Sequence, residues 1–263
     1  MGRYVDFGVR ADHEKLDVTD FKAVSQMCKE LQPTIVLHLA AATDLSRCER
    51  EPDFAIRVNS VGTYNVALAA REVGALMVHV STSAIFDGEK KSPYHEDDVP
   101  NPLSEFGHSR YLAECAVRSV SSEHLIVRVS WVFGGGPESD KKFVAKILGQ
   151  IEQKEIRVVA GKIGSPTFGK DAIHGIKKLV LEGRRGIVHL PNAGISTRVE
   201  VAREILAITN SRAVLTEVDE SEFGIPYRSG FNESMTTQPF MRPWQAALRE
   251  YLEEEWRDTM QPL

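Results

Sequence analysis

The chain has 263 residues, of which 42% are hydrophobic and 26% charged, and its net charge is -5. These values are typical of a globular protein and exclude a disordered or fibrous chain. The acidic balance argues against nucleic-acid binding, which normally requires a basic stripe. No apolar run approaches the length of a membrane span and no signal peptide is recognisable, so we expect a soluble, cytoplasmic protein with no membrane partner.

The three cysteines lack a C-x-x-C spacing, and the eight histidines lack an H-x-x-x-H spacing. This pattern predicts neither a disulfide framework nor a metal site. A reducing compartment fits it best.

Short apolar runs alternate with amphipathic segments along most of the chain. Strands are predicted, in chain order, at residues 4–10, 34–42, 76–81, 125–132, 156–159 and 186–190. Helices are predicted at residues 20–31, 61–73, 104–120, 142–154, 171–182, 199–208 and 243–257. The run at 4–10 is interpreted as the second strand of a sheet.

This alternation predicts an α/β fold with a doubly wound, Rossmann-like parallel sheet. After Gly134 the alternation of predicted strands and helices becomes less regular, which indicates a second structural unit. We expect residues 1–133 and 168–190 to form the nucleotide-binding domain. Residues 134–167 and 191–263 are expected to form a smaller C-terminal substrate-binding lobe.

The fold is predicted to be truncated at its N-terminus. A doubly wound nucleotide fold normally opens with a strand, a glycine-rich turn and a helix that holds the pyrophosphate. The sequence contains no G-x-x-G-x-x-G, and Gly134-Gly135-Gly136 follows a later strand, where it is interpreted as a loop. Two explanations stay open: the reading frame begins upstream of Met1, or the protein has lost its phosphate-binding loop.

Short motifs in a fixed order run over most of the chain. They are LDVTD (16–20), HLAAAT (38–43), VN (58–59), VSTSAIFDG (80–88), PYHED (93–97), RVSWVFG (128–134), GSPT (164–167), RPW (242–244) and AL (247–248). In this order they resemble the dTDP-4-dehydrorhamnose reductase family of the extended short-chain dehydrogenases.

The resemblance implies a reaction in which NADP or NAD passes hydride to the C4 ketone of a nucleotide-linked 6-deoxysugar. In such enzymes a Tyr supplies a proton, a Lys one helical turn later holds the nicotinamide ribose, and a Ser or Thr hydrogen-bonds the carbonyl. Thr82 matches the hydroxyl position. Phe106 and Arg110, however, stand at the Tyr and Lys positions.

These two replacements predict an impaired or inactive reductase. Phenylalanine has no proton to give, and a general acid contributes about a hundred- to ten-thousand-fold in rate. Arg110 keeps the positive charge for a ribose but does not release a proton. On a helix, His108 and Tyr111 lie away from the face of Phe106, so Tyr94 is the one phenol retained as a substitute acid.

The resemblance also assigns cofactor and substrate positions. Asp17 and Val18 would meet the adenine, Ala40, Ala41 and Ala42 would lie along the cofactor, and Asn59 would support that loop. Simple tight packing of the alanines stays open as an alternative. The missing glycine loop predicts weakened binding of NADP or NAD.

On the substrate side, Trp131 would line the sugar-nucleotide pocket, although a core tryptophan stays open. Ser83 and Ala84 stand where the family has Asp and Tyr, which implies altered substrate recognition.

Two functions therefore stay open. The first is a reductase-like protein acting on a nucleotide sugar. The second is a non-catalytic nucleotide-binding or regulatory scaffold subunit, as in the methionine adenosyltransferase beta subunit, which is similar to this family. The sequence also leaves open whether the protein forms a homo-oligomer or binds a different protein partner. It does not decide between NADH and NADPH.

Overall fold

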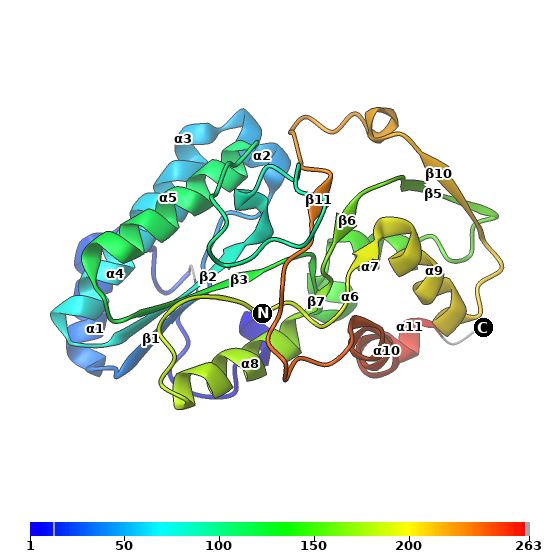
Figure 1. The fold of residues 1–263 in the computed structure, drawn as a ribbon. Helices are drawn as coiled ribbons and strands as arrows, with labels where there is room; N and C mark the ends of the chain where they lie inside the picture. Colours follow the sequence, from blue (N-terminus) through cyan, green and yellow to red (C-terminus); the bar gives the residue numbers. More distant parts are fainter. Residues whose placement is uncertain (13, 261–263) are drawn as a thin grey trace.

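The computed structural model describes residues 1–12 and 14–260 (Figure 1). The α-helices are α1 (Phe21–Leu31), α2 (Leu45–Arg50), α3 (Pro52–Ala55), α4 (Gly62–Glu72), α5 (Glu105–Val120), α6 (Gly136–Ser139), α7 (Phe143–Leu148), α8 (Gly169–Leu181), α9 (Arg198–Thr209), α10 (Trp244–Glu255) and α11 (Arg257–Met260). The strands are β1 (Ile35–His38), β2 (Leu76–Thr82), β3 (His124–Val129), β4 (Val132–Phe133), β5 (Glu155–Val159), β6 (Ile163–Gly164), β7 (Thr167–Phe168), β8 (Gly186–His189), β9 (Ser196–Thr197), β10 (Val214–Val218) and β11 (Asn232–Glu233).

The main sheet is parallel and has the strand order β1-β2-β3-β8. In strand β2 alternate side chains enter opposite cores, and six of its seven residues are buried. Val78 and Val80 pack with α8 on one face, whereas Met77 packs with α1 and α4 on the other. Helices therefore cover both faces of the sheet, as Figure 1 shows. The expected α/β fold with a parallel sheet is confirmed.

The segments that follow β3 contribute a separate hydrophobic core. Residues from β5, α7, α9 and α10 pack together around Phe168 and Tyr251. Strand β5 pairs with β10, and β6 lies between β11 and β9. In Figure 1 these elements lie to one side of the main sheet, beyond its carboxyl end.

Helix ends follow the side chains that cap them. The Asp20 carboxylate accepts hydrogen bonds from the amides of Lys22 and Ala23 at the start of α1. Ser104 accepts from the amide of Gly107 at the start of α5. Each cap satisfies amides that have no partner inside the helix.

Residues 4–10 were expected to be a strand, and this is wrong. A 3-10 turn spans Gly2–Tyr4, and residues 5–10 contain no strand. Val5 instead packs into the core between the sheet and α8. The sequence pattern also missed α2 and α3, which are short and carry mixed polar residues. Within the described residues, no helix is long and apolar enough to cross a membrane.

A buried ion pair joins α5 to the sheet. Arg128 on β3 donates from Nε to Glu114 Oε1 at 2.9 Å and from Nη2 to Glu114 Oε2 at 2.8 Å. The two side chains are 2% and 0% exposed. Arg128 Nη1 also donates to the carbonyl of Glu96, whose carboxylate accepts from the amide of His189. The pair therefore fixes α5, β3 and β8 relative to one another.

Arg128→Met should lower the free energy of unfolding by about 3–5 kcal/mol, because it leaves the Glu114 carboxylate buried without its partner. Urea denaturation measures this loss. The matched control is Arg185→Met, which breaks the surface pair Arg185–Glu123, with side chains 38% and 63% exposed, and should cost about 1 kcal/mol or less. Equal small losses in both variants would contradict the structural role of the buried pair.

Candidate functional site

The candidate site lies at the carboxyl end of β2, where open parallel sheets normally bind ligands. Thr82 ends this strand and caps the following turn by accepting a hydrogen bond from the Ala84 amide at 3.2 Å. Because Thr82 Oγ1 acts as the acceptor in this bond, its hydroxyl hydrogen can be donated to another acceptor. Ser83 is buried and its Oγ lies 3.1 Å from Ser130 Oγ, so the Ser83 side chain is held by the end of β3.

Phe106 lies beside this turn. It occupies the first turn of α5 and is 8% exposed, packed in a cluster with Cys48, Ala55 and Ala84. The neighbouring Gly107 has no side chain, and a methyl group there would collide with the Ala84 carbonyl. Helix α5 can therefore approach the turn closely. The side chain that it contributes there is a hydrocarbon ring.

Arg110 lies one turn further along α5 and points into the core. It is 4% exposed, its Nη2 donates to the Val80 carbonyl, and the same nitrogen lies 3.4 Å from His79 Nε2. Among the described residues, Arg110 Nη1 and His79 Nδ1 have no hydrogen-bond partner. Burial lowers the pKa of Arg110 to about 10, so the guanidinium is still charged at neutral pH.

Two buried histidines lie next to this charge. Burial, with a smaller contribution from Arg110, lowers the pKa of His38 to about 3 and holds that of His79 well below its usual value. The two rings stack with centroids 5.6 Å apart, and His38 Nε2 lies 3.1 Å from Thr63 Oγ1. Both imidazoles are therefore neutral at pH 7 and are poor proton donors.

Asn59 fixes the loop after β1. The side chain is fully buried, accepts from the Ala42 amide at 2.8 Å, and donates to the Ala42 carbonyl at 3.2 Å and to Ser109 Oγ at 2.9 Å. It thereby ties the loop that contains Ala40, Ala41 and Ala42 to α5. Ala40 is exposed and its two neighbours are half-buried.

Asp17 and Val18 lie in the loop before α1, separate from the Thr82 turn. The Asp17 carboxylate accepts from the amide and hydroxyl of Thr19, both at 2.8 Å, and these bonds lower its pKa. The Val18 carbonyl accepts from Asn65. The Asp17 contacts are local and leave its side chain exposed, whereas Asn65 ties Val18 to α4.

Tyr94, the substitute acid considered from the sequence, is held in another network. Its hydroxyl donates to Asp87 at 2.6 Å, and its ring stacks on Phe86 at 4.2 Å and is 4% exposed. Burial and the Asp87 hydrogen bond raise the pKa of Tyr94, which makes it a weaker acid. Tyr111 packs against the same cluster, and His108 is exposed.

Trp131 stands between β3 and β4 in a left-handed conformation, with a φ of 41° that is strained for a bulky side chain. Its indole Nε1 donates to the Glu233 carboxylate. A methyl group on Gly164 would collide with the indole. Arg198 covers the ring, with its Cζ 3.7 Å from the ring centroid.

Arg198 and Glu233 were not among the site residues expected from the sequence. A capping box at Thr197 and Glu200 marks the start of α9, so the place of Arg198 on a helix is readable. Its contact with Trp131 joins residues far apart in the chain and has no local signal.

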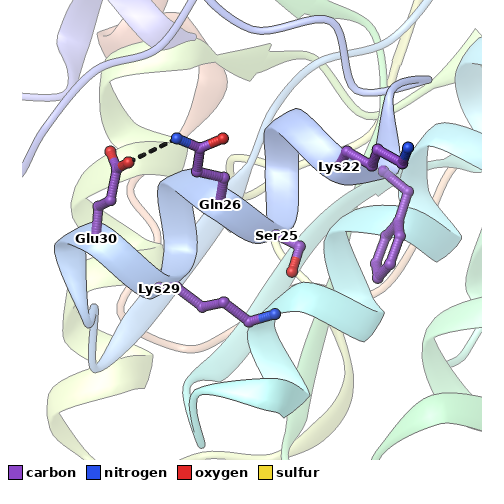
Figure 2. Close-up of a pocket in the computed structure, with 6 residues that line it drawn as sticks. Lys22, Ser25, Gln26, Lys29 and Glu30 are labelled. Carbon is purple, nitrogen blue, oxygen red and sulfur yellow. Dashed lines mark hydrogen bonds between the residues drawn. The ribbon is translucent and has the colours of Figure 1, made fainter.

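A separate surface depression lies on the outer face of α1. It is lined by Phe21 and by five residues labelled in Figure 2: Lys22, Ser25, Gln26, Lys29 and Glu30. Gln26 pairs with Glu30 at 2.8 Å and Lys29 with Glu72 on α4 at 3.1 Å, and Ser25 also bonds Glu72. None of the candidate site residues lines it.

The buried histidines predict a pH dependence of stability. His38 has a folded-state pKa of about 3, below the value of about 6.5 in the unfolded chain, so protons bind preferentially to the unfolded state. Stability is complete above about pH 6.5 and falls as the pH decreases. In His38→Gln, the slope of unfolding free energy between about pH 6 and about pH 5 should be shallower by about 1 kcal/mol per pH unit.

Urea denaturation at several pH values measures this slope. His108→Gln, at an exposed position of α5, is the matched control and should keep the wild-type slope. An unchanged slope in His38→Gln would show that this histidine is not held neutral by the fold.

Gly164→Ala should destabilise the protein by about 1–3 kcal/mol, because the added methyl group displaces the Trp131 indole. Gly149→Ala is the control, since its methyl group would meet atoms only at 3.5 Å and beyond. Thermal unfolding and the near-ultraviolet circular dichroism of the tryptophans report both effects. A Gly164→Ala variant with the wild-type melting temperature and spectrum would contradict the indole position.

The chain is similar to known proteins over most of its length. The RmlD substrate binding domain family matches residues 5–257. The spore coat polysaccharide biosynthesis protein SpsK of Bacillus subtilis is 35% identical over 246 residues, which span 91% of this chain and 86% of SpsK.

Solved structures lead to the same family. The crystal structure of a dTDP-4-dehydrorhamnose reductase from Clostridium acetobutylicum matches with a TM-score of 0.89 and 30% identity, over 93% of this chain and 89% of that one. The Bacillus anthracis reductase, solved in complex with NADP, matches with a TM-score of 0.88 and 31% identity over the same shares. The chain therefore belongs to the dTDP-4-dehydrorhamnose reductase family of sugar-nucleotide reductases.

Proposed function

We propose that this protein binds a nucleotide-linked sugar at the carboxyl end of β2 and is impaired as a reductase of that sugar. The observation that carries the proposal is Phe106, a hydrocarbon ring packed beside the Thr82 turn. Reduction of a ketone leaves an alkoxide that must be protonated, and a positioned acid contributes about 10²–10⁴ in rate.

Three other titratable side chains are also poor proton donors, which supports the loss of this acid. Tyr94 is bonded to Asp87 and has a raised pKa, and the imidazoles of His38 and His79 are held neutral. Thr82 keeps a hydroxyl that suits a hydrogen bond to a sugar carbonyl. We therefore infer that the site orients a keto group but protonates its reduction product slowly.

The family cofactor fits this edge of the sheet only in part. The loop of Ala40, Ala41 and Ala42 carries small side chains, is held by Asn59 through the Ala42 amide and carbonyl, and is partly exposed. Arg110, which the resemblance assigns to the nicotinamide ribose, has its guanidinium buried against Val80 and His79. The nicotinamide side therefore does not fit NADP or NAD well, and no step of the proposal runs through either cofactor.

Restoring the two family residues tests the proposal. Phe106→Tyr combined with Arg110→Lys should raise the turnover of a dTDP-4-keto-6-deoxysugar by about 10²–10⁴, because it restores a phenol with a cation one turn away. Oxidation of NADPH, followed by its absorbance, measures the rate. The single variants Phe106→Tyr and Arg110→Lys show how much of the rate increase comes from the phenol and how much from the ammonium group.

Two controls make the result interpretable. Tyr111→Phe removes a phenol that packs in another cluster and should leave the rate unchanged. Wild-type turnover near the ordinary enzymatic value of about 10 s⁻¹, abolished by Tyr94→Phe, would contradict the proposal and identify a substitute acid.

A further inference from the structure

Arg198 presents an unpaired positive charge next to the candidate site. It is the first residue of α9, and its guanidinium lies over Trp131, with Cζ 3.7 Å from the ring centroid, and 4.6 Å from the centroid of Phe143. Contact with two rings fixes the guanidinium plane and limits its motion. The side chain as a whole is half-buried, so its N–H groups are partly open to solvent.

The donors of Arg198 have no acceptor within the part of the chain that the structure describes. Its guanidinium forms no ion pair and no hydrogen bond there, whereas Arg128 and Arg242 each bind a carboxylate. The nearby Glu233 carboxylate is engaged by the Trp131 indole instead. Desolvation lowers the pKa of Arg198 to about 10, so the charge persists at neutral pH.

A second cation lies close to Arg198. Lys142 precedes Phe143, and desolvation and the charge of Arg198 lower its pKa, whereas Asp140 raises it. Glu233 likewise raises the pKa of Arg198, so each of the two cations has a carboxylate in its neighbourhood.

A chain of hydrogen bonds links Trp131 to the residue after Thr82. Ser83 Oγ lies 3.1 Å from Ser130 Oγ, and Ser130 Oγ donates to the Glu233 carbonyl at 3.0 Å. Glu233 in turn accepts from the indole that Arg198 covers. Thr82 pairs with Val129, two residues before Trp131, so Thr82 and the indole that Arg198 covers lie at the same carboxyl end of the sheet.

We propose that Arg198 is a specificity-determining residue that binds a pair of anionic oxygens on the nucleotide-linked sugar. A guanidinium donates two parallel hydrogen bonds to the oxygens of a phosphate or carboxylate, which an ammonium does not. The oxygens belong either to the diphosphate or to a carboxylate on the sugar. This inference rests on the proposed function, because it assumes that the cleft takes a nucleotide sugar.

Isothermal titration calorimetry of wild type and Arg198→Gln tests the assignment with four probes: thymidine, dTDP, dTDP-glucose and dTDP-glucuronate. If Arg198 binds the diphosphate, the variant should bind dTDP at least about tenfold more weakly and thymidine equally well. If it binds a sugar carboxylate, only dTDP-glucuronate should weaken. Arg198→Lys should recover part of the lost affinity, because lysine restores the positive charge without the paired, coplanar donors of a guanidinium.

Arg203→Gln is the matched control, since Arg203 is an exposed arginine of the same helix, and it should leave every affinity unchanged. Equal affinities of wild type and Arg198→Gln for all four probes would overturn the assignment while leaving nucleotide-sugar binding intact. An equal loss in Arg203→Gln would also overturn it. Absence of binding of any probe to the wild type would refute the proposed function itself, together with this inference.

Discussion

The buried pair between Arg128 and Glu114 is the constraint on which the site depends. Phe106, Arg110 and Glu114 are spaced four residues apart on α5 and so share one face of the helix. When Arg128 on β3 binds Glu114 through two hydrogen bonds, it sets the position of that face on the sheet. Phe106 then lies beside the Thr82 turn, and Arg110 lies against β2.

This frame keeps its shape although the side chains that it positions have changed. Gly107 allows α5 to approach Ala84, and Asn59 ties the loop after β1 to Ser109. Neither contact depends on a phenol at position 106. Packing and backbone geometry therefore hold α5 and the loop after β1 in place whatever residue stands at position 106.

Sequence patterns predicted the elements with local signals. A continuous apolar run defines β2, and apolar residues at helical spacing predict helices at 20–31 and 104–120, which α1 and α5 occupy from Phe21 and Glu105 onward. The apolar residues at 4–10 misled the same reasoning, because Val5 is buried by packing between the sheet and α8 and forms no strand pairing. Hydrophobicity alone did not distinguish burial within a paired strand from burial of a single side chain in an irregular segment.

The sequence predicted which residues belong to the site but not the directions in which their side chains point. Thr82, Phe106 and Arg110 were found from motif positions, but the inward direction of Arg110 depends on the Val80 carbonyl and His79, which no spacing indicates. The stacking of Arg198 on Trp131 likewise joins two separate elements. Contacts of this kind are set by tertiary structure and leave no local pattern.

The central claim is that no proton donor meets the keto oxygen of a bound sugar. A crystal structure of the wild-type protein with a dTDP-4-keto-6-deoxysugar tests this most directly. We expect the Thr82 hydroxyl within hydrogen-bond distance of that oxygen, with the Phe106 ring beside it. A tyrosine, histidine or other titratable side chain at about 2.6–3.2 Å from the same oxygen would contradict the account.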